Sequence, residues 1–297
     1  MLHEYKIPCL DLAQIAQSGQ CFRMIREEDG ERYRIISRGR ILRVSQSGET
    51  VIFDCEEHAL DYWLDYFDFH RDYSAIIRSV NTADTYLLAA AQAGCGIRIL
   101  RQDPWEMIIT FVISQQKTIP KIRELVEALS ARYGAPLTPS AAEDAENASG
   151  LYAFPTPDQL AAATLQELQE LKLGYRAKYI HKLARDGAEG ILDISALSQM
   201  SYEKAMDYLT GFYGIGKKVA NCVCLFGLHH VEAFPVDTWI EKILMEQYYT
   251  KRRYGRTPKT RLYDKIIGDH FGRYEGCAGI MQQYIFNFER NVRRGKP

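Results

Sequence analysis

The sequence predicts an α+β protein, in which a small antiparallel sheet domain precedes a larger helical domain. Residues 21–55 consist of short runs of apolar and polar residues, a pattern typical of antiparallel hairpins. Turn-forming dipeptides separate these runs: Asp29-Gly30, Arg38-Gly39 and Ser47-Gly48. From about Glu56 the apolar residues take a helical spacing. Because 297 residues are many for one core, we expect separate domains at residues 1–95 and 96–297.

The helical part contains one well-marked helix start and several further amphipathic segments. At Asp103-Pro104 an N-cap aspartate precedes a proline at the first helical position, and Glu106 stands where a capping box places it. The apolar run that follows predicts a buried helix ending near Ser114. Residues 135–150, rich in Ala, Pro and Ser, predict a loop. Further helices are predicted at residues 56–67, 82–94, 157–171, 177–190, 201–211, 217–228, 238–249 and 280–292.

The composition limits the classes of protein and of site. No stretch of 18 uncharged apolar residues predicts a membrane span, and the first ten residues lack the apolar core of a secretory signal. The seven cysteines form no zinc or iron–sulfur pattern, so we expect reduced thiols in a cytoplasm and no metal or other cofactor.

The net charge of −1 hides an asymmetry along the chain. Residues 211–297 carry 15 Lys and Arg against 8 Asp and Glu, whereas the other 210 residues carry 22 against 30. A basic C-terminal third is compatible both with a phosphate-binding face and with chance clustering, and charge alone leaves both open.

The stretch GFYGIGKKVANC, residues 211–222, predicts a hairpin between two helices. Gly214 and Gly216 permit positive φ and a close approach of the backbone. Backbone N–H groups of such a turn, at the start of a helix, form an anion site. A helix–hairpin–helix of this kind holds a DNA phosphate without reading the base sequence.

Lys218 and Cys222 are four residues apart and therefore share one face of the second helix. Lys218 lies at the positive end of that helix with Lys217 beside it, and both effects disfavour the ammonium form, as a nucleophilic amine requires. The alternative is that both lysines contact solvent or phosphate, as exposed lysines usually do. The stretch by itself does not decide between these interpretations.

Asp237 supplies a carboxylate 19 residues after Lys218. Aspartate is a favoured N-cap, and Asp237 stands at the start of a predicted helix. Thr238 and Glu241 form a T-x-x-E capping box of their own, so that Asp237 is not needed as the cap if Thr238 takes that position. A carboxylate near a neutral lysine is the pair that cleavage of an N-glycosyl bond requires.

These motifs resemble those of the helix–hairpin–helix DNA glycosylases with a Gly/Pro…Asp loop. GIGKKVANC followed by PVDTWI looks like the loop itself, and a lysine at position 218 marks members that are also lyases. The wider resemblance is to the 8-oxoguanine DNA glycosylases, through residues 96–116, SGQCFR (18–23) and LGYRAKY (173–179). The chain lacks the C-terminal four-cysteine cluster of the endonuclease III-type relatives.

This resemblance implies a TATA-binding-protein-like sheet domain and a glycosylase domain of two helical subdomains with the active site in the cleft between them. It implies a bifunctional DNA glycosylase/AP lyase that excises 8-oxoguanine from double-stranded DNA in base excision repair. Lys218 would attack C1′ of the flipped nucleotide, expel the base and form a Schiff base, and beta-elimination would then nick the strand. Asp237 would assist both steps. The resemblance implies a monomer that acts away from membranes, in the cytoplasm of a prokaryote or in the nucleus of a eukaryote.

The resemblance also assigns the residues that hold the base. Gln282 and Phe286 lie four residues apart and share a face of the last helix. In the family the matching pair reads the Watson–Crick edge of the base and stacks on the base, and Cys222 would cover its other face. Gly19 matches the glycine whose carbonyl accepts a hydrogen bond from N7–H of 8-oxoguanine. Guanine lacks that hydrogen, so this one acceptor separates lesion from normal base.

Other residues match positions that contact DNA in the family. Gln116 would fill the gap left by the flipped nucleotide, Tyr175 would wedge the duplex, and Arg176 would touch the opposite base. The hairpin amides at Gly214 and Gly216 would meet backbone phosphates.

Four positions depart from the eukaryotic pattern. Tyr213 replaces a proline of the hairpin, and Trp239 replaces a histidine near the 5′ phosphate. Lys121 replaces an arginine that helps to recognise the opposite cytosine, and Gln116 replaces an asparagine. We therefore predict a weaker preference for cytosine opposite the lesion than in the eukaryotic relatives.

Two other functions remain open from the sequence. One is a glycosylase for another damaged base, such as an alkylated purine, that uses Asp237 alone and has no lyase activity. The other is a non-catalytic helix–hairpin–helix protein, which would bind DNA in a salt-dependent way but release no base.

Overall fold

The computed structural model describes residues 1–28, 30–137 and 150–293. Residues 292 and 293 are described by their backbone alone. Its N-terminal part is a five-stranded antiparallel sheet with the strand order β1-β5-β4-β3-β2. The three predicted hairpins are confirmed, although Asp29 of the first turn lies outside the described residues. The strands are β1 (Leu2–Lys6), β2 (Met24–Arg26), β3 (Arg32–Ser37), β4 (Arg40–Ser47) and β5 (Thr50–Asp54).

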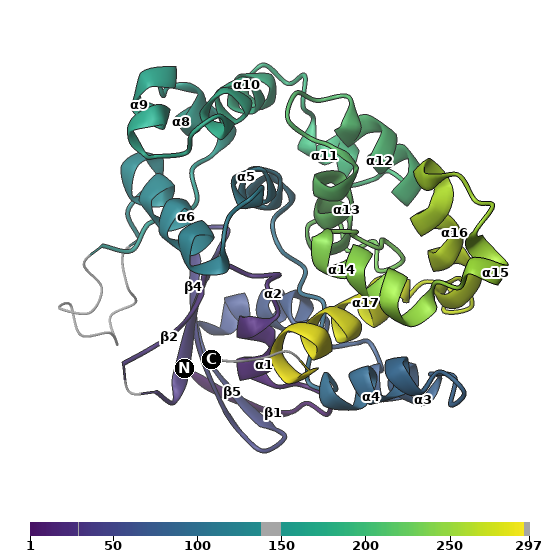
Figure 1. Cartoon of the computed structure of the whole chain (residues 1–297). Helices are drawn as coiled ribbons and strands as arrows, with labels where there is room; N and C mark the ends of the chain where they lie inside the picture. The colour runs from purple at the N-terminus through teal and green to yellow at the C-terminus, as the bar shows by residue number, and fades with distance from the viewer. Residues whose placement is uncertain (29, 138–149, 294–297) are drawn as a thin grey trace.

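Helices α1 and α2 cover one face of this sheet (Figure 1). Alternate residues of β4 and β5 are buried, as Leu42, Val44 and Phe53 show, because successive side chains of a strand point to opposite faces. They pack in one apolar core with Ile15 of α1 and Trp63 of α2. Strand β1, which the sequence did not predict, adds to the edge of the sheet beside β5.

The remainder of the chain is helical, and every predicted helical segment contains a helix. The predicted helix 157–171 is two helices, because Thr164 begins a capping box of its own with Glu167. The predicted loop at 135–150 lies largely outside the described residues. The α-helices are α1 (Leu12–Gln17), α2 (Glu57–Tyr66), α3 (Tyr73–Arg78), α4 (Thr85–Ala93), α5 (Pro104–Ser114), α6 (Ile119–Tyr133), α8 (Pro157–Ala161), α9 (Leu165–Glu170), α10 (Arg176–Ala188), α11 (Ile194–Leu197), α12 (Tyr202–Thr210), α13 (Lys217–Phe226), α14 (Thr238–Ile243), α15 (Lys251–Tyr254), α16 (Lys259–Phe271) and α17 (Ala278–Asn287). Short π-helices, η1 (Leu244–Tyr248) and η2 (Phe288–Arg293), continue α14 and α17.

Helix α5 lies at the centre of the helical part, between α6 and α8–α10 on one side and α11–α14 on the other (Figure 1). Asp103 caps it by accepting a hydrogen bond of 2.9 Å from the N–H of Glu106, as predicted. Residues of α3 and α4, although they precede residue 95, belong to the helical core. The predicted domain division at residues 95 and 96 stays a prediction.

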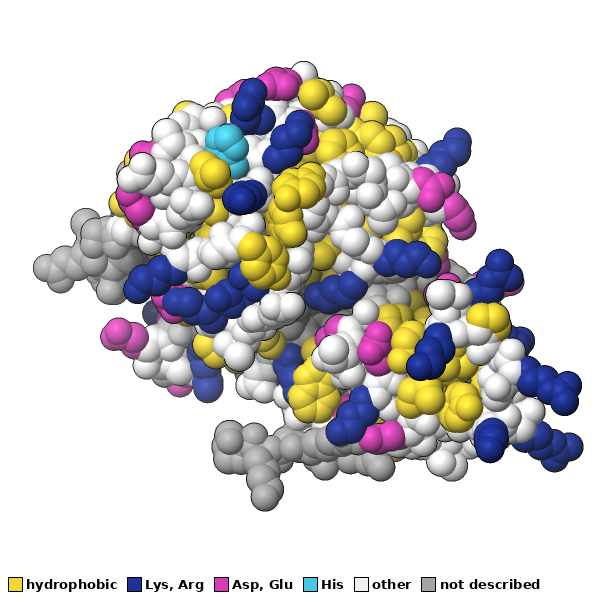
Figure 2. Space-filling view, turned by 45° about the horizontal axis from the view of Figure 1, so that its top comes forward, with side chains coloured by type: hydrophobic (Ala, Val, Ile, Leu, Met, Phe, Trp, Pro, Cys, Tyr) yellow, Lys and Arg dark blue, Asp and Glu magenta, His cyan; other side chains and the backbone are white. Residues whose placement is uncertain are grey.

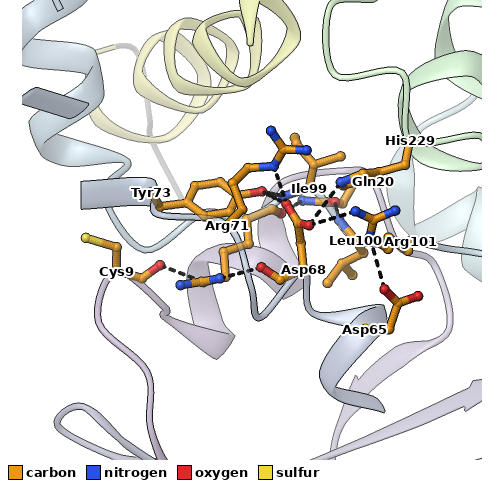
Figure 3. Close-up of polar contacts among 11 residues, drawn as sticks. Cys9, Gln20, Asp65, Asp68, Arg71, Tyr73, Ile99, Leu100, Arg101 and His229 are labelled. Carbon is orange, nitrogen blue, oxygen red and sulfur yellow. Dashed lines mark hydrogen bonds and ion pairs between the residues drawn. The ribbon is translucent and has the colours of Figure 1, made fainter. Parts of the chain in front are cut away.

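A buried polar cluster around Asp68 joins the segment after α2 to the segment after α13 (Figure 3). The carboxylate of Asp68 accepts hydrogen bonds from Arg71 at 2.7 Å and from the Tyr73 hydroxyl at 3.0 Å. It also accepts one from Arg101 at 3.2 Å, and Nε2 of His229 lies 3.2 Å from its Oδ1. One buried carboxylate therefore links segments more than 150 residues apart in the chain.

We expect Asp68→Asn to lower the free energy of unfolding by about 2–3 kcal/mol, because it removes a charged acceptor from a buried cluster. Burial raises the pKa of the Asp68 carboxyl, but His229 and Arg71 hold it well below its ordinary value. The stability that the Asp68 carboxylate adds to the folded state is therefore fully present at neutral pH, and it is lost as the pH falls through that lowered pKa. Denaturant unfolding at neutral pH measures the difference.

The control is Asp72→Asn, an exposed N-cap of α3, where asparagine caps about as well as aspartate. We expect this change to cost less than about 0.5 kcal/mol. Equal effects of the two substitutions would contradict the role given to the Asp68 cluster.

Candidate active site

The predicted hairpin joins α12 to α13 and rests on α10. Gly214 has a φ of +92°, and a Cβ added there would lie 2.4 Å from Cγ of Tyr179. The ring of Tyr179 packs edge-on against Tyr213 and Tyr175, with centroid distances of 4.8 and 5.6 Å. The side chain of Gln115, from the loop after α5, donates a hydrogen bond of 2.9 Å to the carbonyl of Gly214. Gly216 is the N-cap of α13, so the hairpin leads directly into the helix of the candidate nucleophile.

The two lysines of α13 have different surroundings. Lys217 is 81% exposed at its side chain, and its Nζ lies 3.9 Å from Asp264. Lys218 is partly buried, and its Nζ lies 5.5 Å from the ring centroid of Phe111 in α5. Cys222 is buried one turn further along the helix. Lys218 is therefore the lysine that faces the interior.

The pKa of the Cys222 thiol depends on the charges around it. Burial raises its pKa; the ammonium of Lys218 opposes this rise, and the carboxylate of Asp237 adds to it. The charges of Lys218 and Asp237 therefore both act on the same buried thiol of α13.

Asp237 is the N-cap of α14. Its Oδ1 accepts a hydrogen bond of 2.9 Å from the N–H of Ile240, and the helix begins at Thr238. The alternative in which Thr238 caps the helix is thus wrong, because Thr238 is already the first helical residue. Capping uses one carboxylate oxygen, and no hydrogen bond to Oδ2 is found among the described residues.

Helix α17 brings the predicted base-binding residues to the loop of Asp237. Gln282 is buried, donates a hydrogen bond of 3.0 Å to the carbonyl of Pro235 and accepts one of 2.8 Å from Gln283. One turn later, Phe286 is partly buried and packs against Gly19. A methyl group added at Gly19, whose φ is +80°, would lie 3.7 Å from Cε1 of Phe286.

Several residues predicted to contact DNA lie on the loop after α5 and at the starts of α6 and α10. Gln116, exposed and with a φ of +53°, lies in the loop after α5, and Tyr175, which is 44% exposed, precedes α10. Arg176 is buried, lies 4.4 Å from the ring centroid of Tyr175 and donates to the carbonyl of Gln115. Lys121, in the first turn of α6, pairs with the exposed Glu124 at 2.5 Å.

The face that carries α10 is rich in cations. With α10 turned toward the viewer, Lys and Arg side chains form a band across the molecule, and exposed apolar side chains lie beside it (Figure 2). Such a combination suits a nucleic acid, whose phosphates need cations and whose bases stack on aromatic rings.

Two family models together match most of the chain. The model of the 8-oxoguanine DNA glycosylase N-terminal domain matches residues 4–108, and that of the HhH-GPD superfamily base excision DNA repair proteins matches residues 109–263. The chain belongs to the 8-oxoguanine DNA glycosylases of the HhH-GPD superfamily.

Individual relatives of this 8-oxoguanine glycosylase family agree over nearly the whole length. The structure of MBOgg1 in complex with a low affinity DNA ligand is 33% identical, with a TM-score of 0.86 over 99% of this chain and 96% of that one. The Clostridium acetobutylicum 8-oxoguanine glycosylase/lyase, in complex with DNA containing cytosine opposite 8-oxoG, is 32% identical, with a TM-score of 0.85 over 99% and 98%. The Saccharomyces cerevisiae N-glycosylase/DNA lyase is 29% identical over 94% of this chain and 83% of its own.

In this family member the departures from the eukaryotic pattern lie at the surface. Tyr213 and Trp239 are 57% and 39% exposed.

Within the described ranges, no helix is both long and apolar enough to cross a bilayer.

Four residues that contact the candidate site were not identified from the sequence. Gln115 and Tyr179 fix the hairpin, whereas Arg123 and Arg290 contact the end of α1 just before Gly19. Their contacts cross between segments far apart in the chain, and spacing within one helix gives no signal for them.

We expect Gly214→Ala to lower the free energy of unfolding by about 2 kcal/mol, because a Cβ there would meet the Tyr179 ring and φ is in the left-handed region. Gly216→Ala is the matched change: its φ is −95° and a Cβ would meet nothing within 4 Å. Thermal or denaturant unfolding compares the two. If both glycines tolerate alanine equally, the contact with Tyr179 does not shape the hairpin.

Proposed function

We propose that this protein is a bifunctional DNA glycosylase/AP lyase that excises 8-oxoguanine from double-stranded DNA in base excision repair. One observation carries the proposal. Lys218 is partly buried one turn before the buried Cys222 on α13, Asp237 begins α14 with a charge that acts on the Cys222 thiol, and α17 brings Gln282 against the loop before Asp237. The family and its relatives support the same activity. We infer that the protein acts on DNA as a monomer, in the cytoplasm of a prokaryote or in the nucleus of a eukaryote.

Lys218 supplies the nucleophile. Its neutral amine forms a bond to C1′ as the N-glycosyl bond breaks, and the base leaves with that electron pair. Asp237 stabilises the positive charge that develops on the sugar, because a carboxylate beside an oxocarbenium-like centre lowers the energy of the transition state. The sugar ring opens to a Schiff base on Lys218. Loss of a proton from C2′ then expels the 3′ phosphate, and water releases the lysine.

The base pocket selects the lesion. Phe286 stacks on one face of the flipped base, and Cys222 covers the other. Gln282 is held by Pro235 and Gln283, so its amide meets the Watson–Crick edge in a set orientation. The carbonyl of Gly19 accepts from N7–H of 8-oxoguanine; against guanine, the same carbonyl faces a lone pair, which costs binding free energy.

Incubation with a duplex that contains a single 8-oxoguanine tests the proposal. Release of 8-oxoguanine together with a nick 3′ of the site is expected, and a duplex with guanine at the same position should stay intact. Release of an alkylated purine without a nick would favour a monofunctional glycosylase. Salt-dependent binding without release of any base would favour a non-catalytic DNA-binding protein.

We predict that the rate of cutting depends only weakly on the base opposite the lesion. Lys121 is engaged with Glu124, and the guanidinium of Arg176 is engaged with the carbonyl of Gln115. Because Arg176 is buried with a partner in the protein, and Lys121 stands where the eukaryotic relatives have an arginine, we expect rates opposite C, A, G and T to fall within about 10-fold of one another. Single-turnover cutting of the four duplexes measures this, and strict dependence on cytosine would contradict it.

A further inference from the structure

Helix α1 ends two residues before Gly19, and its last carbonyls are held by arginines from distant segments. The final carbonyls of a helix lack partners within the helix. Nη2 of Arg123, from α6, donates a hydrogen bond of 2.7 Å to the carbonyl of Ala16. Nη2 of Arg290, from η2, donates to the carbonyl of Gln17. Cationic donors at this end also suit the helix dipole.

The guanidinium of Arg290 reaches the base-binding residues as well. A Cβ added to Gly19 would lie 3.2 Å from its Nη1, and its Cζ lies 5.0 Å from the ring centroid of Phe286. Its Nε donates a hydrogen bond of 3.1 Å to Asn291. The guanidinium of Arg290 therefore contacts both the Phe286 ring, which would stack on the base, and the backbone beside Gly19, whose carbonyl would read the base.

The surroundings of Arg290 include burial and two charged side chains. Burial lowers its pKa, while the carboxylate of Asp237 opposes that change and Arg123 adds to it. An arginine remains charged in such surroundings, and its fixed, flat fork of donors suits a bridge between a carbonyl and an aromatic ring.

We propose that Arg290 is a positioning residue for lesion recognition: it fixes the Gln17–Gly19 segment against Phe286 and so sets the place of the Gly19 carbonyl in the base pocket. This inference rests on the proposed function. Arg290 acts through Gly19 and Phe286 and takes no part in bond making. Its loss should therefore weaken recognition of the damaged base more than the chemistry at C1′, because a small misplacement of a pocket group costs one to two orders of magnitude in rate.

The test compares Arg290→Met with wild type on two duplexes, one with 8-oxoguanine and one with a preformed abasic site at the same position. The abasic site has no base to recognise but still needs Lys218. We expect the single-turnover rate to fall about 10-fold more on the 8-oxoguanine duplex than on the abasic duplex. Arg290→Lys, which keeps a cationic donor, should recover part of the difference. Arg123→Met should shift the ratio of the two rates in the same direction.

The matched control is Arg273→Met, which removes an exposed arginine that lies 6.0 Å from the ring centroid of Tyr274. It should leave the ratio of the two rates unchanged. Equal losses on both duplexes, or none, would overturn the role of Arg290, and faster excision would show that Arg290 obstructs the pocket. If the wild type cuts abasic DNA but releases no 8-oxoguanine, the proposed substrate itself is wrong.

Discussion

Lys218→Gln is expected to lower base release and strand cutting on the 8-oxoguanine duplex by at least about 10³-fold. Glutamine keeps the polarity and much of the length of lysine but cannot form a Schiff base. The side chain lies one turn from Cys222 and 5.5 Å from the ring centroid of Phe111, so no other lysine of α13 can take its place. Single-turnover kinetics with enzyme in excess measures the loss.

Lys217→Gln is the matched control, because it makes the same chemical change at the adjacent residue. Lys217 is exposed, and its 3.9 Å approach to Asp264 is a surface ion pair of small energetic value. We expect Lys217→Gln to change the rates of base release and strand cutting by less than about 3-fold. Similar losses for the two variants would mean that positive charge near the hairpin, rather than one nucleophile, carries the activity.

Asp237→Asn is expected to lower the rate of base excision by about 10²-fold or more, because it removes the charge that we propose stabilises the sugar. This substitution separates the two roles of Asp237. Asparagine is as good an N-cap as aspartate and can still accept from the N–H of Ile240. The thermal midpoint should therefore stay within a few degrees of wild type while the rate falls.

Asp237→Ala completes the comparison, because it removes the cap as well as the charge. We expect it to lower the unfolding free energy by about 1 kcal/mol. An Asn variant with the wild-type rate would reduce Asp237 to a structural cap.

Much of the fold follows from short-range patterns in the sequence. The hairpins at Arg38-Gly39 and Ser47-Gly48 and the start of α5 at Asp103 are confirmed, because turn and cap preferences act over a few residues. Strand β1 was not predicted. Its five residues are exposed or partly buried, and they are placed by pairing with β5, some 50 residues away, and by packing of Tyr5 on Phe53 and Phe69. Spacing could not show that the predicted helix 157–171 is divided at Thr164.

Less of the candidate site could be predicted from short-range sequence patterns. Spacing of four residues puts Lys218 with Cys222, and Gln282 with Phe286, on common helix faces. It could not show that Arg176 is buried against the loop after α5. Nor could it bring Arg290 to Gln17, because 273 residues separate them. Contacts of this kind depend on how whole helices pack, which no local window of the sequence contains.

Borohydride trapping on the 8-oxoguanine duplex, with the attachment site mapped by peptide mass spectrometry, tests the central claim most directly. Reduction of a Schiff base fixes the DNA to the enzyme through a stable amine. We predict a covalent complex attached at Lys218, formed by the wild type and by Lys217→Gln but not by Lys218→Gln. Release of 8-oxoguanine without any trapped complex, or attachment at a residue other than Lys218, would contradict it.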